Sequence, residues 1–130
     1  MTLLLDTSLW IDFTRARSPA PLKQFIAPFV LDPEAHLAEP VLFEVLRSAS
    51  PEEARWLEAQ FGPLPCLPTP GDLWQRVIAL GRACRQIGRT LASLDPLVAA
   101  VALHHNAVLL SFEAIVSESE LRLQRLQPPA

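Results

Sequence analysis

Apolar residues recur at helical spacing along much of the chain, and prolines separate one such segment from the next. The longest run lies at 70–87, where an apolar stripe recurs every three or four residues and Gly88 follows as a helix end. The stripe comprises Leu73, Val77, Leu80, Cys84 and Ile87. Proline is well tolerated at the first helical position, so the other segments also predict helices. The predicted helices are 8–15, 19–30, 40–49, 51–61, 70–87 and 96–105.

Local signals refine these helix boundaries. Ser50-Pro-Glu-Glu53 has the pattern of a capping box, and Thr69-Pro-Gly-Asp72 resembles one. Pro28 is expected to shorten the second helix, because proline disrupts a helix interior. Asn106 can cap the last helix in the left-handed conformation, so the two histidines before it are interpreted as helix residues and not as general bases.

Short segments between the helices predict strands. The segments at 2–6 and 107–111 are almost wholly apolar, as parallel strands covered on both faces should be. The segment at 121–126 alternates Leu with Arg and Gln, which is typical of an edge strand. The predicted strands are 2–6, 35–38, 65–67, 107–111 and 121–126. Strands that alternate with helices indicate the α/β class, here an α/β/α sandwich with a mainly parallel central sheet of about five strands.

Composition supports a single domain over residues 1–130. Half of the residues are apolar, 19% are charged and the formal net charge is −3, which allows a sizeable core. The acidic balance argues against a protein that coats DNA electrostatically and leaves room only for a local basic patch. Lys23 is the only lysine. Such a patch would therefore consist of arginines, whose guanidinium groups suit bidentate contact with phosphates.

The two cysteines and the N-terminus bear on the cellular compartment. Cys66 and Cys84 are too few for a disulfide framework and lack the spacing of a zinc site or a CxxC redox pair. The chain shows no basic leader, and no run approaches the roughly 20 apolar residues of a membrane span. We expect a cytoplasmic protein with two reduced thiols.

Three carboxylates are brought to one edge of the predicted sheet by topology alone. Asp6 ends the first strand, and Glu113 follows the strand at 107–111. The helix at 96–105 must run antiparallel to the strand after it, so Asp95 at its start lies at the same carboxyl edge. Ligands bind at this edge in open parallel sheets.

Clustered carboxylates need a proton or a cation. Two unit charges about 4 Å apart repel by ~4 kcal/mol at an effective dielectric near 20. Hard oxygen ligands select Mg²⁺ or Mn²⁺. The chemistry that these residues indicate is metal-assisted attack of water on a phosphodiester.

Four segments together carry a family resemblance. They are "LLLDTSLWIDF" at 3–13, "PVLFEVL" at 40–46, "SLDPLVAAVALHHNAVLLSFE" at 93–113 and "LRLQRL" at 121–126. In order and spacing, over nearly the whole chain, the sequence resembles a PIN-domain ribonuclease of the VapC toxin type. The positions that match the family's four acids, and its supporting hydroxyl, are Asp6, Glu44, Asp95, Glu113 and Ser8.

The resemblance implies a function and partners. It implies an Mg²⁺-dependent endoribonuclease, with Mn²⁺ as a second cation, that acts on RNA as the toxin of a toxin–antitoxin pair. It also implies a small cognate antitoxin and a homodimer. The chain departs from the family at Glu113, where Asp is usual and an Asp-Phe pair often follows two residues later. Whether the site holds one or two metal ions is therefore left open.

Each acid also has a purely structural interpretation. Asp6 and Asp95 precede helices and could serve as N-caps. Glu44 could lie on a solvated helix face, paired with Arg47 or Ser48. Glu113 could be a surface loop residue.

The arginines and tryptophans of the helices allow two interpretations each. Arg82, Arg85 and Arg89 lie opposite the apolar stripe and could form a track for RNA phosphates, or they could complement the negative end of the helix dipole. The tryptophans are interpreted as core or interface residues more readily than as platforms for base stacking; they are Trp10, Trp56 and Trp74.

Other function classes remain to be separated by experiment. A PIN-like module that binds RNA or a protein without catalysis is the main alternative. A phosphatase with Asp6 as nucleophile is a third, but Ser8 stands where the haloacid-dehalogenase pattern has a second Asp. No glycine-rich phosphate loop follows the first strand, which argues against a nucleotide-binding domain.

Overall fold

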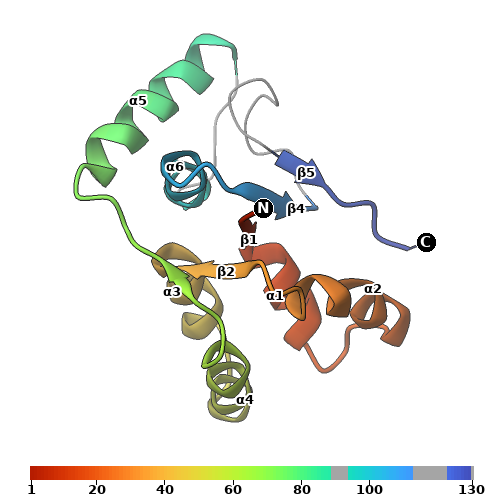
Figure 1. The fold of residues 1–130 in the computed structure, drawn as a ribbon. Helices are drawn as coiled ribbons and strands as arrows, with labels where there is room; N and C mark the ends of the chain where they lie inside the picture. The colour runs from red at the N-terminus through yellow and green to blue at the C-terminus, as the bar shows by residue number, and fades with distance from the viewer. Residues whose placement is uncertain (89–93, 113–122, 130) are drawn as a thin grey trace.

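The computed structural model of the chain describes residues 1–88, 94–112 and 123–129. A five-stranded sheet in the order β3-β2-β1-β4-β5 forms its centre, and every strand pairing in it is parallel (Figure 1). The strands are β1 (Leu3–Leu5), β2 (Ala35–Ala38), β3 (Cys66–Leu67), β4 (Val108–Ser111) and β5 (Leu123–Arg125). The helices are α1 (Thr7–Thr14), α2 (Ala20–Val30), α3 (Glu39–Arg47), α4 (Pro51–Phe61), α5 (Leu73–Gln86) and α6 (Asp95–His104).

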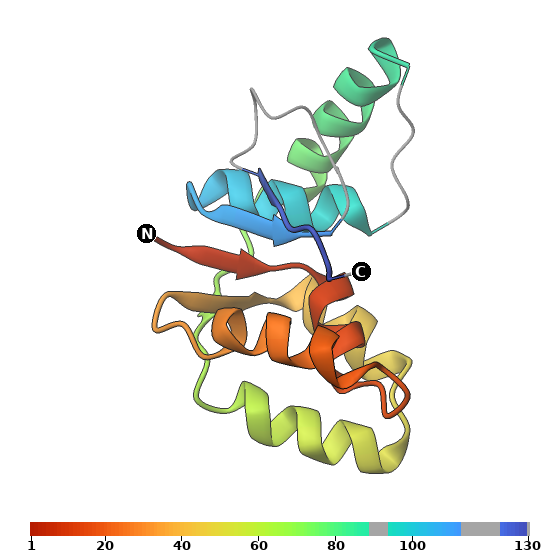
Figure 2. The ribbon, with the colours of Figure 1, turned by 90° about the vertical axis from the view of Figure 1, so that its right-hand side faces the viewer.

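Helices cover both faces of the sheet. The connections from β1 to β2 and from β2 to β3 run in one direction along the sheet, and the connection from β3 to β4 runs back. Because such crossovers are right-handed, the first two place their helices on one face and the third places its helices on the other. Figures 1 and 2 agree, with α5 and α6 on one side and α1 to α4 on the other. The predicted α/β/α sandwich is confirmed.

The core lies around the two central strands. Leu4, Leu5, Leu109 and Leu110 are fully buried, as the apolar runs at 2–6 and 107–111 predict. Helix α6 is buried from Pro96 to Ala102, so it lies between the sheet and α5. The segment predicted as an edge strand is β5, which does form one edge of the sheet.

All six predicted helices and all five predicted strands occur, with boundaries shifted by a few residues at most. The Ser50 capping box is confirmed by both of its hydrogen bonds. Asn106 has φ +52° and Gly88 has φ +78°, so both adopt the left-handed conformation expected of helix ends. Local sequence signals therefore located the elements well.

Three local predictions are wrong. Helix α2 continues through Pro28, because Ile26 and Val30 on either side of it are buried in the core. The segment before α5 forms no capping box, since the Thr69 hydroxyl donates to the Glu39 carboxylate instead. Ile87 does not complete the apolar stripe: it is the residue after α5 and is 62% exposed.

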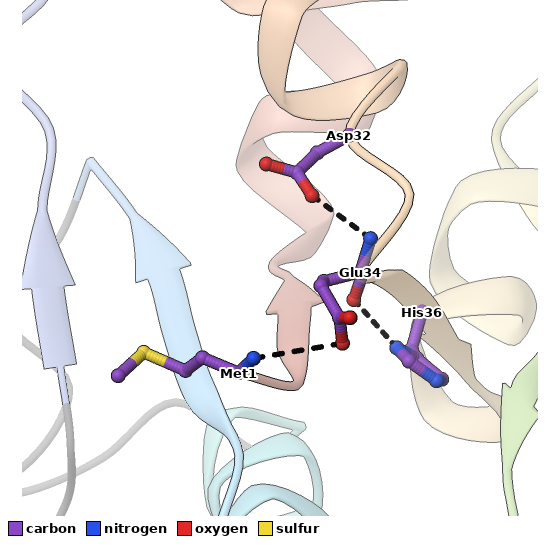
Figure 3. A network of polar contacts seen from close by, with 4 residues as sticks. All are labelled: Met1, Asp32, Glu34 and His36. Atoms are coloured by element: carbon purple, nitrogen blue, oxygen red, sulfur yellow. Dashed lines mark hydrogen bonds and ion pairs between the residues drawn. The ribbon is translucent and has the colours of Figure 1, made fainter.

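The amino edge of the sheet carries a small polar network (Figure 3). The Glu34 N–H donates to Asp32 at 2.8 Å, and His36 Nδ1 lies 2.6 Å from the Glu34 carbonyl oxygen. The Met1 ammonium lies 3.7 Å from the Glu34 carboxylate. These contacts join the starts of β1 and β2, at the edge opposite to the predicted acids.

Two further features concern the chain as a whole. Both cysteines are free thiols, with Cys66 exposed and Cys84 buried. None of the helices in the described ranges has the length and apolar content needed to cross a membrane.

Candidate active site at the carboxyl edge

The end of β1 places Asp6 at the carboxyl edge of the sheet. Strands β1 and β4 are paired neighbours, and the Asp6 N–H continues their ladder by donating to the Leu110 carbonyl at 3.0 Å. The next residue is already helical, so Asp6 lies at the corner between strand and helix. The residue is only 3% exposed.

The Asp6 carboxylate accepts hydrogen bonds from residues of α1 and β4. Its Oδ1 accepts the Thr7 N–H at 2.8 Å, which makes Asp6 the N-cap of α1. Its Oδ2 accepts the Ser111 hydroxyl at 2.8 Å and the Ser8 hydroxyl at 3.4 Å. The structural interpretation of Asp6 as a cap is therefore correct, and the same contacts fix the orientation of the carboxylate for a chemical role.

Glu44 reaches this corner from α3. Helices α1 and α3 pack together, and the Thr7 hydroxyl donates to Glu44 Oε1 at 3.0 Å. The two alternative partners, Arg47 at the end of α3 and the C-cap residue Ser48, make other contacts. Arg47 lies over the Phe43 ring, and the Ser48 hydroxyl donates to main-chain carbonyls. The side of α3 that carries Glu44 thus faces α1.

Asp95 is the first residue of α6, and Leu94 occupies the N-cap position. Its interpretation as an N-cap is therefore not what the structure shows. Helix α6 leads back into β4, so its N-terminal turn lies at the carboxyl edge as topology predicts (Figure 2). A carboxylate there is stabilised by the positive end of the helix dipole.

The other candidate residues from the sequence are the arginines, Glu113 and the tryptophans. Arg82 and Arg85 are exposed on α5, which extends away from the sheet in Figure 2. Glu113 and Arg89 lie outside the described residues, so their roles stay predictions. Trp10 is buried against Phe61, whereas Trp56 and Trp74 are exposed.

The donor set suits a hard cation that keeps most of its water. Within residues 1–88, 94–112 and 123–129, no three His, Cys, Asp or Glu side chains form a group able to hold a metal ion. Mg²⁺, however, is usually bound through one or two carboxylates together with waters and substrate phosphates. Asp6 and Glu44, joined through Thr7, provide such a pair of carboxylates.

Sequence reasoning missed two residues of this site. Ser111 donates to Asp6 from the end of β4, and Thr7 joins Asp6 to Glu44. The signal for Ser111 was a polar residue that ends an otherwise apolar strand. Thr7 gave no such signal, because its contact with Glu44 depends on how α1 packs against α3.

The pKa values of Glu53, Asp72 and Cys66 are shifted by their surroundings. A hydrogen bond from the Ser50 N–H lowers the pKa of Glu53, and one from Arg76 lowers the pKa of Asp72. Burial, and then the nearby charge of Glu39, raises the pKa of the Cys66 thiol. A raised pKa disfavours the reactive thiolate, so Cys66 is not a candidate nucleophile.

A groove of about 590 Å³ lies beside α1, α3 and α4. Its walls come from the C-terminal end of α1, the C-terminal end of α3 and the start of α4. Arg15 and Arg17 line one wall, and Glu52 and Glu53 line another. Asp6, Glu44 and Asp95 do not line it.

Comparison with protein families matches residues 3–118 to the family described as PIN domain. No curated protein sequence matches the chain. The match confirms the resemblance seen in the sequence.

Solved structures share the fold. The VapBC2 structure from Rickettsia felis, bound to a promoter DNA fragment, has a TM-score of 0.75 at 16% identity, covering 98% of this chain and 100% of that chain. VapBC-1 from nontypeable Haemophilus influenzae has a TM-score of 0.72 at 19% identity, covering 95% and 97%. VapBC-5 from Mycobacterium tuberculosis, of the VapBC family of toxin-antitoxin systems, has a TM-score of 0.61 at 17% identity, covering 95% and 97%.

Proposed function

This chain belongs to the PIN-domain family, and from that membership we propose that it is a divalent-metal-dependent endoribonuclease that serves as the toxin of a toxin–antitoxin pair. The observation that carries the proposal is the pair of Asp6 and Glu44 at the carboxyl edge, both hydrogen-bonded to Thr7. This is the edge at which open parallel sheets bind their ligands.

The acids come from different parts of the chain and are proposed to form one metal site. Asp6 and Glu44 would hold Mg²⁺ or Mn²⁺ together with waters and substrate phosphate, and the family resemblance implies Asp95 and Glu113 as further acids of the site. The metal would lower the pKa of a bound water and stabilise charge on the phosphodiester. Ser111 and Ser8 donate to Asp6 Oδ2 and keep that carboxylate oriented. The Ser8 contact supports the role that the family resemblance implies for this hydroxyl.

The RNA substrate would be bound through its phosphates. Arg82 and Arg85 are exposed on α5, and with Arg89 they form the proposed phosphate track. Phosphate contacts give affinity without base information. The track therefore supports binding to RNA of many sequences and leaves target choice to other contacts.

Partners and compartment follow from the same proposal. Solved structures that share the fold include VapBC structures, and this supports a small cognate antitoxin as the partner of this chain. A homodimer is proposed on the family resemblance. Two free thiols suit the reducing cytoplasm, where its RNA substrates would be met.

A binding module without catalysis is the second candidate function. Apolar side chains exposed on α5, Trp74 at 67% and Ile78 at 57%, favour it because such groups commonly mark interaction surfaces. The departure at Glu113 also favours it, since a weakened site can still bind.

Metal-dependent cleavage separates the two functions. The wild-type chain should cleave a mixed RNA substrate with Mg²⁺ or Mn²⁺ and stop when EDTA is added. Asp6→Asn and Glu44→Gln should abolish cleavage. Asp12→Asn is the matched control, because Asp12 lies on the same helix and takes no part in the proposed site. If the wild-type chain cleaves no RNA but binds it, the binding module is the correct function.

A further inference from the structure

Thr7 contacts two carboxylates of the proposed site, those of Asp6 and Glu44. The Thr7 main-chain N–H donates to Asp6 Oδ1 at 2.8 Å, and its side-chain hydroxyl donates to Glu44 Oε1 at 3.0 Å. Thr7 and Glu44 are 37 residues apart in sequence and come from different helices. The positions of both carboxylates therefore depend on Thr7.

Thr7 is itself held rigidly. It is the first residue of α1 and only 6% exposed, and Leu9 and Trp10 in the same turn are fully buried. A β-branched side chain has few χ1 rotamers, so the hydroxyl direction is set by the backbone and its packing. The Thr7 hydroxyl therefore has a defined position, whereas the side chain that it contacts is flexible.

Glu44 is that partner. Its side chain is long, partly exposed and has several rotatable bonds, which would otherwise sample many positions. A charge-assisted hydrogen bond from a rigid hydroxyl selects one of them. Without the bond, Glu44 would be free to turn from α1 toward solvent.

We propose that Thr7 is a positioning residue, which holds Glu44 beside Asp6 so that the two carboxylates bind one divalent cation. The proposal rests on the proposed function, because it assigns Thr7 a task in that site. It assigns the main-chain N–H to Asp6 and the hydroxyl to Glu44, and this division makes it testable.

Substitution of Thr7 separates the two contacts. Thr7→Val has nearly the same shape and keeps the N–H bond to Asp6, but it loses the bond to Glu44. Thr7→Ser loses a methyl group and keeps the hydroxyl. Thr14→Val is the matched control, since the Thr14 hydroxyl on the same helix donates only to the Ile11 carbonyl at 3.2 Å.

The measurement is direct binding of Mn²⁺ to the full chain by electron paramagnetic resonance, without RNA. Loss of a group that orients a metal ligand typically costs 10–100-fold in affinity, so Thr7→Val should weaken Mn²⁺ binding by about tenfold or more. Thr7→Ser and Thr14→Val should bind like the wild type. Melting in EDTA shows whether each variant is folded, and Thr7→Ala, which also loses the hydroxyl, replaces Thr7→Val if that variant does not fold.

Two results would overturn the proposal. One is wild-type Mn²⁺ affinity in the folded variant without the hydroxyl, and the other is equal loss in Thr7→Ser and Thr7→Val. RNA cleavage is measured separately. A wild-type chain that binds Mn²⁺ but cleaves no RNA would refute the proposed function. The Mn²⁺ affinities of the variants would still test the role of Thr7.

Discussion

Asp6 is both a helix cap and a candidate metal ligand, and two substitutions separate these roles. Asp6→Asn and Asp6→Ala both remove the negative charge. Asn is as good an N-cap as Asp, so its side-chain oxygen can still accept the Thr7 N–H. Its amide nitrogen can donate to Ser111, whose hydroxyl is able to accept. Alanine keeps neither contact.

The structure gives the size of the difference in stability. Loss of an N-cap costs about 1 kcal/mol. The Ser111 side chain is fully buried, and loss of a buried hydrogen bond such as the one it donates to Asp6 costs about 1–3 kcal/mol. Asp6→Ala should thus be less stable than Asp6→Asn by about 2–4 kcal/mol. At roughly 4 °C per kcal/mol for a domain of this size, its Tm should be lower by about 8–16 °C.

Urea unfolding in EDTA measures this difference without a metal ion. Asp6→Asn should be at least as stable as the wild type, because it relieves repulsion between Asp6 and Glu44. Both variants should lose cleavage of RNA. If Asp6→Asn were destabilised as much as Asp6→Ala, the charge and not the hydrogen bonds would be what stabilises this corner. Equal stability of Asp6→Ala and the wild type would show that neither the cap nor the Ser111 bond contributes.

Three further predictions test other parts of the molecule. Arg85→Ala should weaken binding to unrelated RNAs alike and lower the slope of log K against log salt by about 0.7 in filter binding, whereas Arg55→Ala on α4 should not change it. Glu53→Ala should lower the urea midpoint at pH 7. Because the capping bond lowers the pKa of Glu53, the difference in midpoint between the variant and the wild type should vanish as the pH falls through that pKa. A difference in midpoint that persists at pH 2.5 would contradict the role of the Glu53 charge. Glu113→Gln should reduce cleavage and raise the Mg²⁺ concentration that is needed, while Glu113→Asp should keep activity or increase it; full activity in Glu113→Gln would remove Glu113 from the site.

Much of the fold could be predicted because its signals are local. Apolar periodicity located the helices and strands, and the wholly apolar segments at 2–6 and 107–111 indicated buried parallel strands. The direction of the parallel strands, and the antiparallel course of the helix at 96–105, then placed Asp6 and Asp95 at one edge without reference to any distance. Glu44 needed the family resemblance, since a mid-helix carboxylate carries no positional signal of its own.

Local signals failed where packing outweighed them. Pro28 stays within α2 because residues on both sides of it are buried, and the energy of that burial offsets the one main-chain bond that proline lacks. Thr69 bonds to Glu39 rather than capping α5, because β3 brings the two residues together. In both cases a neighbour distant in sequence decides the outcome.

The same distinction divides the site. Sequence alone determined which acids the chain carries and the edge of the sheet at which two of them lie, because strand direction follows from the order of the elements. Only the tertiary structure decided how the acids are held. Ser111 reaches Asp6 across 105 residues and Thr7 reaches Glu44 across 37, through the pairing of β1 with β4 and the packing of α1 on α3. A side-chain hydrogen bond depends on distance and direction within a few tenths of an ångström, and those are properties of the packed molecule, not of residue order.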